Sequence, residues 1–223
     1  LMQVREFRRL MEEVADFPLQ YFYDVRESIL RIRVENSHLE EDELFDLRRS
    51  LSTIADMVKI LNHSDDDDEP EDGWKREKKY PYPALHRLSQ DVVTFPQLIQ
   101  RIDQILDKFG KIRDNATPEL LQIRRELAKT EGSISRTLYS ILRSAQSEGI
   151  VEKDVTPTLR DGRLVIPVIP TLKRKIKGIV HDESATGKTV FIEPTEVVEA
   201  NNRVRELEGE ERKEIIRILT DFT

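Results

Sequence analysis

The sequence contains no cysteine among its 223 residues. That absence excludes disulfide bonds and zinc or iron–sulfur centres ligated by cysteine, and it fits a reducing cytosol. The sequence also lacks an apolar run of the ~20 residues that a membrane-spanning helix needs, so we expect a soluble, cytoplasmic protein. Because it opens at Leu1 with Met2 behind it and stops at Thr223 within a helical pattern, we interpret it as a piece of a longer chain.

Glycine is scarce, with 8 residues, whereas charged residues make up 35% of the chain. This composition favours long solvated helices over a thick globule. We therefore predict a mainly α fold in which a helical core is followed by two long antiparallel helical arms that carry a small β-rich tip. The predicted regions are a core at 1–116 with an acidic loop at 62–83, a first arm at 117–154, the tip at 155–193 and a returning arm at 194–223.

Apolar residues recur at helical spacing through the first half of the chain. The pattern predicts a helix from Leu1 that ends at Phe17-Pro18, a second over about 25–34 and a third over about 40–61, and we expect these three to pack together. Shorter helices are predicted at about 85–93 and 96–106. Acidic residues at the start of the third helix complement the positive end of its dipole.

The acidic loop has seven carboxylates in the eight residues 65–72. A calcium-binding helix–loop–helix needs glycine at its sixth loop position and glutamate at its twelfth, and here those positions hold Pro70 and Arg76. We interpret the segment as a solvated connector. Trp74 beside it is interpreted as loop packing rather than as a base-stacking residue.

Two long helices are predicted in the second half. Thr117-Pro118-Glu119 is a helix start, with threonine as the N-cap and proline in the first turn, and the pattern continues to about Ser147. A helix of similar length follows Pro194. The apolar-face residues expected are Leu120, Ile123, Leu127, Ile134, Leu138, Ile141 and Ala145 on the first arm, and Val197, Asn201, Val204, Leu207, Glu211, Ile215, Ile218 and Phe222 on the second.

Short β-branched runs replace the helical spacing between the arms. Asp161-Gly162 joins the runs 158–160 and 163–168, which predicts a hairpin with a two-residue turn. The runs 179–180 and 190–192 enclose a second polar turn at 184–187. Thr186-Gly187-Lys188-Thr189 imitates the end of a nucleotide-binding P-loop, but Asp182 replaces the required earlier glycine and a strand follows, so we reject ATP binding by this segment.

Positive charge is concentrated on the predicted tip. Residues 155–190 hold seven basic and three acidic residues, a local charge of +4, which leaves −11 for the rest of a chain whose net charge is −7. A basic patch on an acidic body suits phosphate binding, because neutralised phosphates release counterions. The candidate phosphate contacts are Lys173, Arg174, Lys175 and Lys177, together with Arg160, Arg163 and Lys188, which flank turns.

Other polar residues of this region receive structural interpretations. His181-Asp182 lacks a nucleophile or a third partner nearby in the sequence, so we expect Asp182 to brace the turn beside an exposed His181. Asn201 and Asn202 are expected to tune packing between helices. We predict no catalytic residue, metal ligand or cofactor in this sequence.

One set of sequence blocks comprises 160–168, 178–187, 191–194 and 201–202, with further segments at 44–51 and 133–142. These blocks resemble the second bacterial branch of the MutS family, MutS-two. The resemblance implies a core, lever and clamp region, with clamps that close around duplex or branched DNA in a homodimer. It also implies that ATP and Mg²⁺ binding and a C-terminal Smr nuclease domain belong to the full-length protein, and lie downstream of this sequence.

Together with the basic tip, the resemblance leaves three functions open. The first is a non-catalytic DNA clamp that acts in the suppression of homologous recombination. The second is a ribosome-binding module that acts in the rescue of collided ribosomes, with the same basic tip on rRNA or a ribosomal protein. The third is a structural lever that couples an ATPase to a distal partner.

Overall fold

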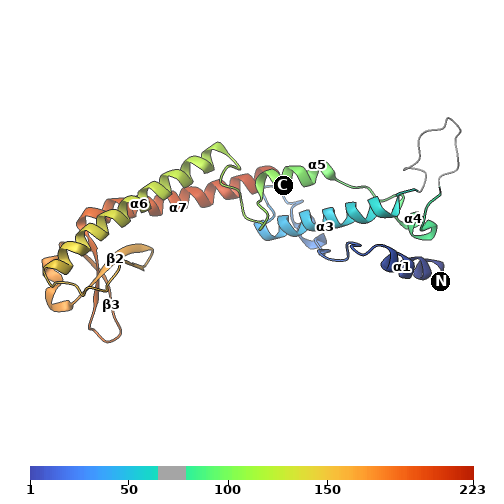
Figure 1. Ribbon diagram of the computed structural model, residues 1–223. Helices are drawn as coiled ribbons and strands as arrows, with labels where there is room; N and C mark the ends of the chain where they lie inside the picture. Colours follow the sequence, from blue (N-terminus) through green and yellow to red (C-terminus); the bar gives the residue numbers. More distant parts are fainter. Residues whose placement is uncertain (65–78) are drawn as a thin grey trace. The chain divides into compact units, whose positions relative to one another are not determined.

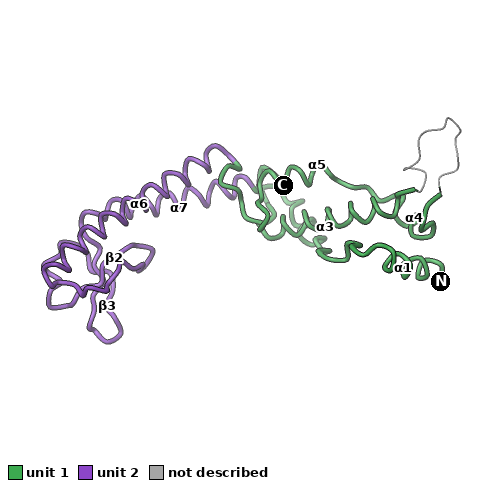
Figure 2. Tube along the Cα trace, viewed as in Figure 1, with its two compact units in different colours: residues 1–116, 219–223 green, residues 117–218 purple. Residues whose placement is uncertain are grey.

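The computed structural model describes residues 1–64 and 79–223. The predicted acidic loop, with Pro70, Trp74 and Arg76, lies largely outside these residues. The chain forms two compact units: unit 1 comprises 1–116 and 219–223, and unit 2 comprises 117–218 (Figure 2). None of the helices in the described ranges combines the length and the hydropathy that a bilayer span requires.

Unit 1 is helical in its described residues. Its elements are α1 (Met2–Glu13), α2 (Arg26–Arg31), α3 (Glu41–Leu61), α4 (Pro83–Ser89) and α5 (Pro96–Ile105) (Figure 1). α3 begins at a capping box, in which Glu40 and Glu43 each bond the other's backbone N–H. α2 and α4 are shorter than the sequence predicts, because each lacks the long apolar stripe that stabilises α3.

The packing in unit 1 differs from the prediction that the first three helices pack together. α1 packs mainly against α4, where Leu10, Tyr82 and Leu85 form a small buried cluster. α2 has no buried residue, and its Ser28 and Arg31 side chains donate hydrogen bonds to Glu43 of α3. The central helix is α3, against which both α4 and α5 pack.

Unit 2 contains two long helices, α6 (Pro118–Ser147) and α7 (Thr195–Phe222), the last turn of which is counted with unit 1. α6 begins as predicted, with the Thr117 hydroxyl accepting a hydrogen bond from the Leu120 N–H at 3.1 Å. α7 begins at Thr195, since Pro194 is the last residue of a strand. Contacts join Thr117 to Glu214, Arg124 to Glu211 and Glu126 to Arg203. The residue number rises along α6 while that of its partner falls along α7, so the two helices are antiparallel.

A four-stranded antiparallel sheet lies between α6 and α7 in the sequence. Its strands are β1 (Thr158–Arg160), β2 (Arg163–Val168), β3 (Gly178–Glu183) and β4 (Val190–Pro194), in the order β1-β2-β4-β3. The predicted hairpin is confirmed: Arg160 pairs with Arg163, and Asp161 and Gly162 both have positive φ, as a type I′ turn requires. The β3–β4 pairing contains a bulge between Val180 and Asp182.

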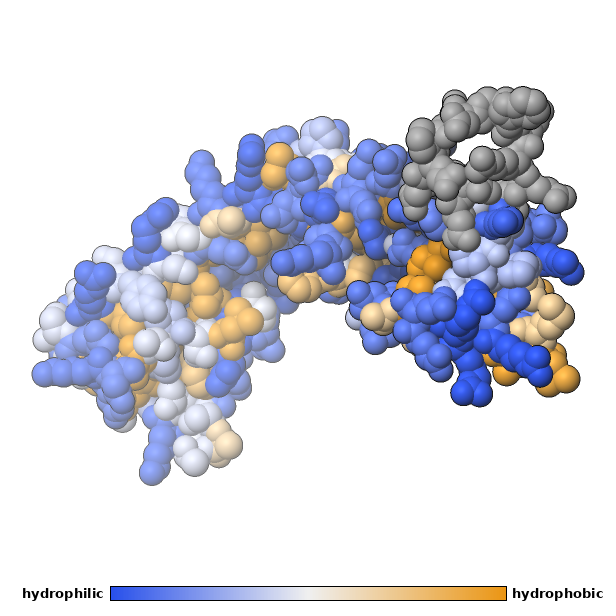
Figure 3. Space-filling view, turned by 45° about the vertical axis from the view of Figure 1, so that its right-hand side comes forward, coloured by the Kyte–Doolittle hydropathy of each residue, from blue (hydrophilic) through white to orange (hydrophobic). Residues whose placement is uncertain are grey.

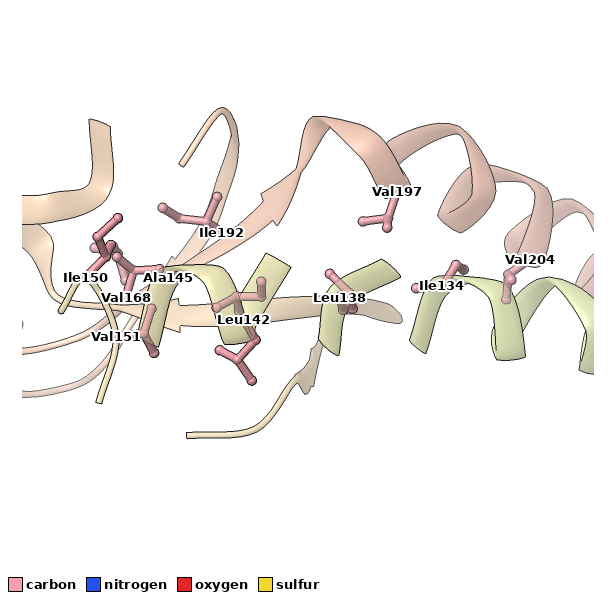
Figure 4. Packing of buried hydrophobic residues seen from close by; sticks show 12 residues of the cluster. Ile134, Leu138, Leu142, Ala145, Ile150, Val151, Val168, Ile192, Val197 and Val204 are labelled. Atoms are coloured by element: carbon pink, nitrogen blue, oxygen red, sulfur yellow. The ribbon is translucent and has the colours of Figure 1, made fainter. Parts of the chain in front are cut away.

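The core of unit 2 joins both helices to the sheet. Every residue of β4 is buried, and Figure 4 shows side chains from α6, the sheet and the first turns of α7 meeting in one cluster. On α6 the buried row is Leu120, Ile134, Leu138, Leu142 and Ala145, and the predicted Ile141 is partly buried against the unit 2 core. Burial of each leucine or isoleucine of this row stabilises the fold by about 1.5–3 kcal/mol relative to an exposed side chain.

Candidate nucleic-acid interface

A short 3-10 helix, η2 (Pro170–Lys175), links β2 to β3 and carries three of the seven predicted phosphate contacts. Leu172 of η2 and Ile176, the residue after it, pack against the unit 2 core. Just beyond it, the Lys177 carbonyl accepts a hydrogen bond from the Thr195 N–H at 3.0 Å. The loop is therefore anchored at its apolar positions and at its end, while its polar positions face solvent.

We call Lys173, Arg174, Lys175 and Lys177 the basic turn. All four side chains are exposed, and within the described part of the chain none of them takes part in an ion pair between side chains. Because successive residues of a 3-10 helix point about 120° apart, the first three side chains spread outward rather than form one flat patch. The basic turn can therefore contact several separate phosphate groups.

Lys188 is exposed but belongs to a different part of the sheet. It lies in the β3–β4 turn, which is held by a hydrogen bond of 2.8 Å from the Ser184 N–H to the Thr189 carbonyl. β3 separates it from Lys177, and six strand residues span about 20 Å at 3.3 Å per residue. The structure does not bring Lys188 to the basic turn.

Arg160 and Arg163 are both engaged by other side chains. The Arg160 guanidinium lies 4.1 Å from the centroid of the Phe191 ring, and its Nε lies 3.5 Å from Asp182 Oδ2. Arg163 Nη1 donates to Glu193 Oε1 at 2.7 Å, and its Nη2 donates to Asn202 Oδ1 at 2.5 Å. These contacts give both arginines a role inside the sheet, and a phosphate contact by either stays a prediction.

Glu193 of β4 is the centre of a cluster of polar side chains that was not predicted from the sequence. Its carboxylate is 0% exposed and accepts three hydrogen bonds, from Arg163, from Asn201 Nδ2 at 2.8 Å and from His181 Nε2 at 2.5 Å. We call Arg163, His181, Glu193 and Asn201 the Glu193 network. It ties three strands and the first turns of α7 together around one buried charge.

The network keeps Glu193 ionised in spite of its burial. Burial by itself raises the pKa of a carboxyl group, because it disfavours the charged form. The hydrogen bonds from His181, Asn201 and Arg163, together with the charge of Arg163, outweigh that effect and hold the pKa of Glu193 below its ordinary value. The carboxylate therefore acts as a fixed negative charge that is shielded from solvent.

Gly178, at the start of β3, allows the close approach of β3 to β4. A Cβ atom at this position would lie 2.1 Å from the Glu193 carbonyl oxygen, so no larger residue fits without moving the backbone. Gly178 and the members of the network come from the separate sequence blocks that carry the MutS-two resemblance. Those blocks therefore meet in one place, as a structural group within the sheet.

Two expectations for this region are corrected. His181 is not an exposed residue beside Asp182: it bonds to Glu193, whereas Asp182 faces Arg160. Asn201 does not act between helices, since it bonds to Glu193 and, at 3.4 Å, to the Leu164 carbonyl. The signal that could have identified Glu193 is an acidic residue inside an otherwise apolar strand, where burial demands partners.

Metal-binding and nucleotide-binding sites are two further possibilities among the described residues. Over 1–64 and 79–223, no group of three or more histidine or acidic side chains is placed to hold a metal ion. The segment Thr186–Thr189 is followed by β4 and not by a helix, so it lacks the helix N-terminus on which a P-loop depends. Hydrophilic residues cover most of the surface in view in Figure 3, with apolar patches between them.

Comparison with known proteins gives one consistent result. No family model matches the chain. Curated proteins named endonuclease MutS2 are similar to it: 32% identity over 206 residues in Geobacillus sp., covering 92% of this chain and 25% of the relative, and 36% over 206 residues in Levilactobacillus brevis, covering 92% and 24%. A third, from Finegoldia magna, is 32% identical over 223 residues, covering 100% and 27%. The chain thus spans about a quarter of the length of the curated relatives it matches.

Proposed function

Since this chain is related to the MutS2 proteins over most of its length, we propose that unit 2 grips duplex or branched DNA through backbone contacts and catalyses no reaction itself. The observation that carries the proposal is the basic turn: four exposed cations on a loop anchored to the unit 2 core. Contacts of this kind position nucleic acid without reading its sequence.

The division of labour follows from the same geometry. The Glu193 network uses its charges inside the sheet, so it supports the loop and has no free group to offer to a substrate. The relatives' name, endonuclease, belongs to proteins of which the matched region is about a quarter. We assign the nuclease and the ATPase of the whole protein, which would bind ATP and Mg²⁺, to residues outside this chain. We further propose that the whole protein acts as a homodimer in the suppression of homologous recombination.

The test uses fluorescence anisotropy to measure the affinity of the 223-residue chain for a four-way DNA junction and for linear duplex at several salt concentrations. We expect affinity to fall steeply as salt rises. Reversal of the basic turn with K173E, R174E, K175E and K177E should weaken binding by roughly tenfold or more and reduce the slope of log affinity against log salt by up to about 3.6.

The matched control reverses four exposed arginines of unit 1, Arg5, Arg8, Arg33 and Arg87, and changes the net charge by the same amount. If both variants lose affinity equally, total charge governs binding and the proposed site is wrong. Unchanged DNA affinity in the basic-turn variant, or binding to purified ribosomes with none to DNA, would also refute the proposal.

A further inference from the structure

A second set of cations lies along α6. Arg125, Lys129, Arg136 and Arg143 are all exposed and are spaced by four, seven and seven residues. At 3.6 residues per turn they fall within about 40° of one another around the helix axis, and they lie about 160° from the buried row of α6. We call them the α6 row. It extends for about 27 Å at 1.5 Å per residue.

The α6 row has one sign of charge. Residues three or four positions from Arg136 and Arg143 are uncharged, and those around Arg125 are uncharged except for Lys129. The carboxylate of Glu126 is three residues from Lys129, but it is taken up by Arg203 of α7 at 2.9 Å. Arg125 and Lys129 form a like-charge pair at a spacing of four residues, which destabilises a helix by about 0.2–0.5 kcal/mol, whereas an ordinary solvated face mixes the two signs.

α7 shows what such an ordinary face looks like. Its exposed cations are Arg205, Arg212, Lys213 and Arg217, and each has a glutamate three or four residues away. For Arg205 and Arg212 that residue is Glu208, for Lys213 it is Glu210, and for Arg217 it is Glu214. The two helices belong to the same unit and have similar lengths, so the uniform sign of the α6 row is a property of that face and not of the composition of the arms.

The surface between the cations permits close approach of a partner. Ala128, Gly132, Ser133 and Ser140 are small, and a Cβ atom on Gly132 would meet nothing within 4 Å. Tyr139, at 45% exposure, lies between Arg136 and Arg143 and carries a hydroxyl that can donate a hydrogen bond. A straight row of cations with small residues between them suits a regular polyanion rather than a globular protein surface.

We propose that the α6 row is a second contact surface for the phosphate backbone of nucleic acid, separate from the basic turn. This inference rests on the proposed function and extends it along the helix. The row lies on the face of α6 opposite its buried side, so it contacts a different stretch of backbone from the one held at the tip. Each phosphate contact adds to the salt dependence of binding.

The experiment compares two matched triple variants of the 223-residue chain, K129Q/R136Q/R143Q on the α6 row and R205Q/R212Q/K213Q on α7. Each removes two arginines and one lysine from an exposed helix face. Binding to a 40-base-pair duplex is followed by anisotropy across salt concentrations, with circular dichroism to check helix content. The α6 variant should weaken binding by roughly tenfold at low salt and lower the salt slope by up to about 2.7. The α7 variant should change neither.

A third variant, which combines the three α6 substitutions with the four charge reversals of the basic turn, separates the two proposals. If the surfaces are independent, the loss in the combined variant equals the product of the separate losses. If the α6 variant binds like the wild type while the basic-turn variant is impaired, the α6 row is not a nucleic-acid surface and the proposed function stands. If the wild type binds no nucleic acid, both fail.

Discussion

The Glu193 network and the basic turn place cations of the same unit in opposite surroundings. Arg163 and His181 surround a buried carboxylate, whereas Lys173 and its neighbours on η2 lie in solvent with no acidic partner in the described chain. A count of charge along the sequence treats these residues alike. Their environments divide them into charges that hold the sheet together and charges that remain available to a phosphate.

The largest effect should come from removing the buried carboxylate. Glu193→Ala leaves Arg163 and His181 without their acceptor in a desolvated site, which we expect to cost about 3–5 kcal/mol of unfolding free energy. Urea unfolding followed by circular dichroism measures it. The control is Lys173→Gln with Lys175→Gln in the basic turn, for which a change within about 0.5 kcal/mol is expected. Similar losses in both would remove the distinction between the two groups.

A smaller loss is expected where β3 crosses the network. Gly178→Ala places a methyl group against the Glu193 backbone, and overpacking of this kind costs about 1–3 kcal/mol. Gly132→Ala on α6 is the matched control, because its methyl group meets open space and alanine favours a helix by about 0.5–1 kcal/mol. The midpoint temperature of thermal unfolding should therefore fall in Gly178→Ala and rise in Gly132→Ala. An unchanged midpoint temperature in Gly178→Ala would contradict the close approach of β3 to β4.

The smallest effect is the dependence of stability on pH. Because the pKa of Glu193 is lower in the folded state than its ordinary value of 4.5, its stabilising contribution is fully present above that value. It is lost as the pH falls through the lower, folded-state pKa. The difference in unfolding free energy between wild type and Glu193→Gln should therefore narrow from pH 6 to pH 3. A difference that is constant with pH would show that Glu193 is not a buried, ionised acceptor.

Local signals predicted the parts of the fold that depend on neighbouring residues. Asp161-Gly162 predicted a hairpin turn, and Thr117-Pro118-Glu119 predicted the start of α6, because each requires only a few residues to adopt particular backbone angles. The overall class, mainly α with a small antiparallel sheet, follows from the same signals. Ile141 lies on the apolar face as predicted and is partly buried against the unit 2 core. The spacing did not single out the neighbouring Leu142, which the packing of the sheet buries fully.

A local signal could have marked Glu193 as a buried acid, but it could not have identified the partners of Glu193 in the network. Its members are 12 and 30 residues apart along the chain in the pairs His181–Glu193 and Arg163–Glu193, and only the strand order β1-β2-β4-β3 brings them together. The packing of α1 on α4 was missed for the same reason, since Leu10 and Leu85 are distant in the sequence. The basic turn was identified from charge alone, but its anchoring through Leu172 and Ile176 required the fold.

The bulge in β3 bears on how this protein behaves in concentrated solution. β3 is an edge strand, and its Ile179 and Val180 side chains are 49% and 44% exposed. A regular apolar edge of that kind is a template on which other chains can add strands and aggregate. The extra residue between Val180 and Asp182 breaks the regular spacing of its hydrogen-bonding groups, so the strand that presents His181 to Glu193 is also protected against edge-to-edge association.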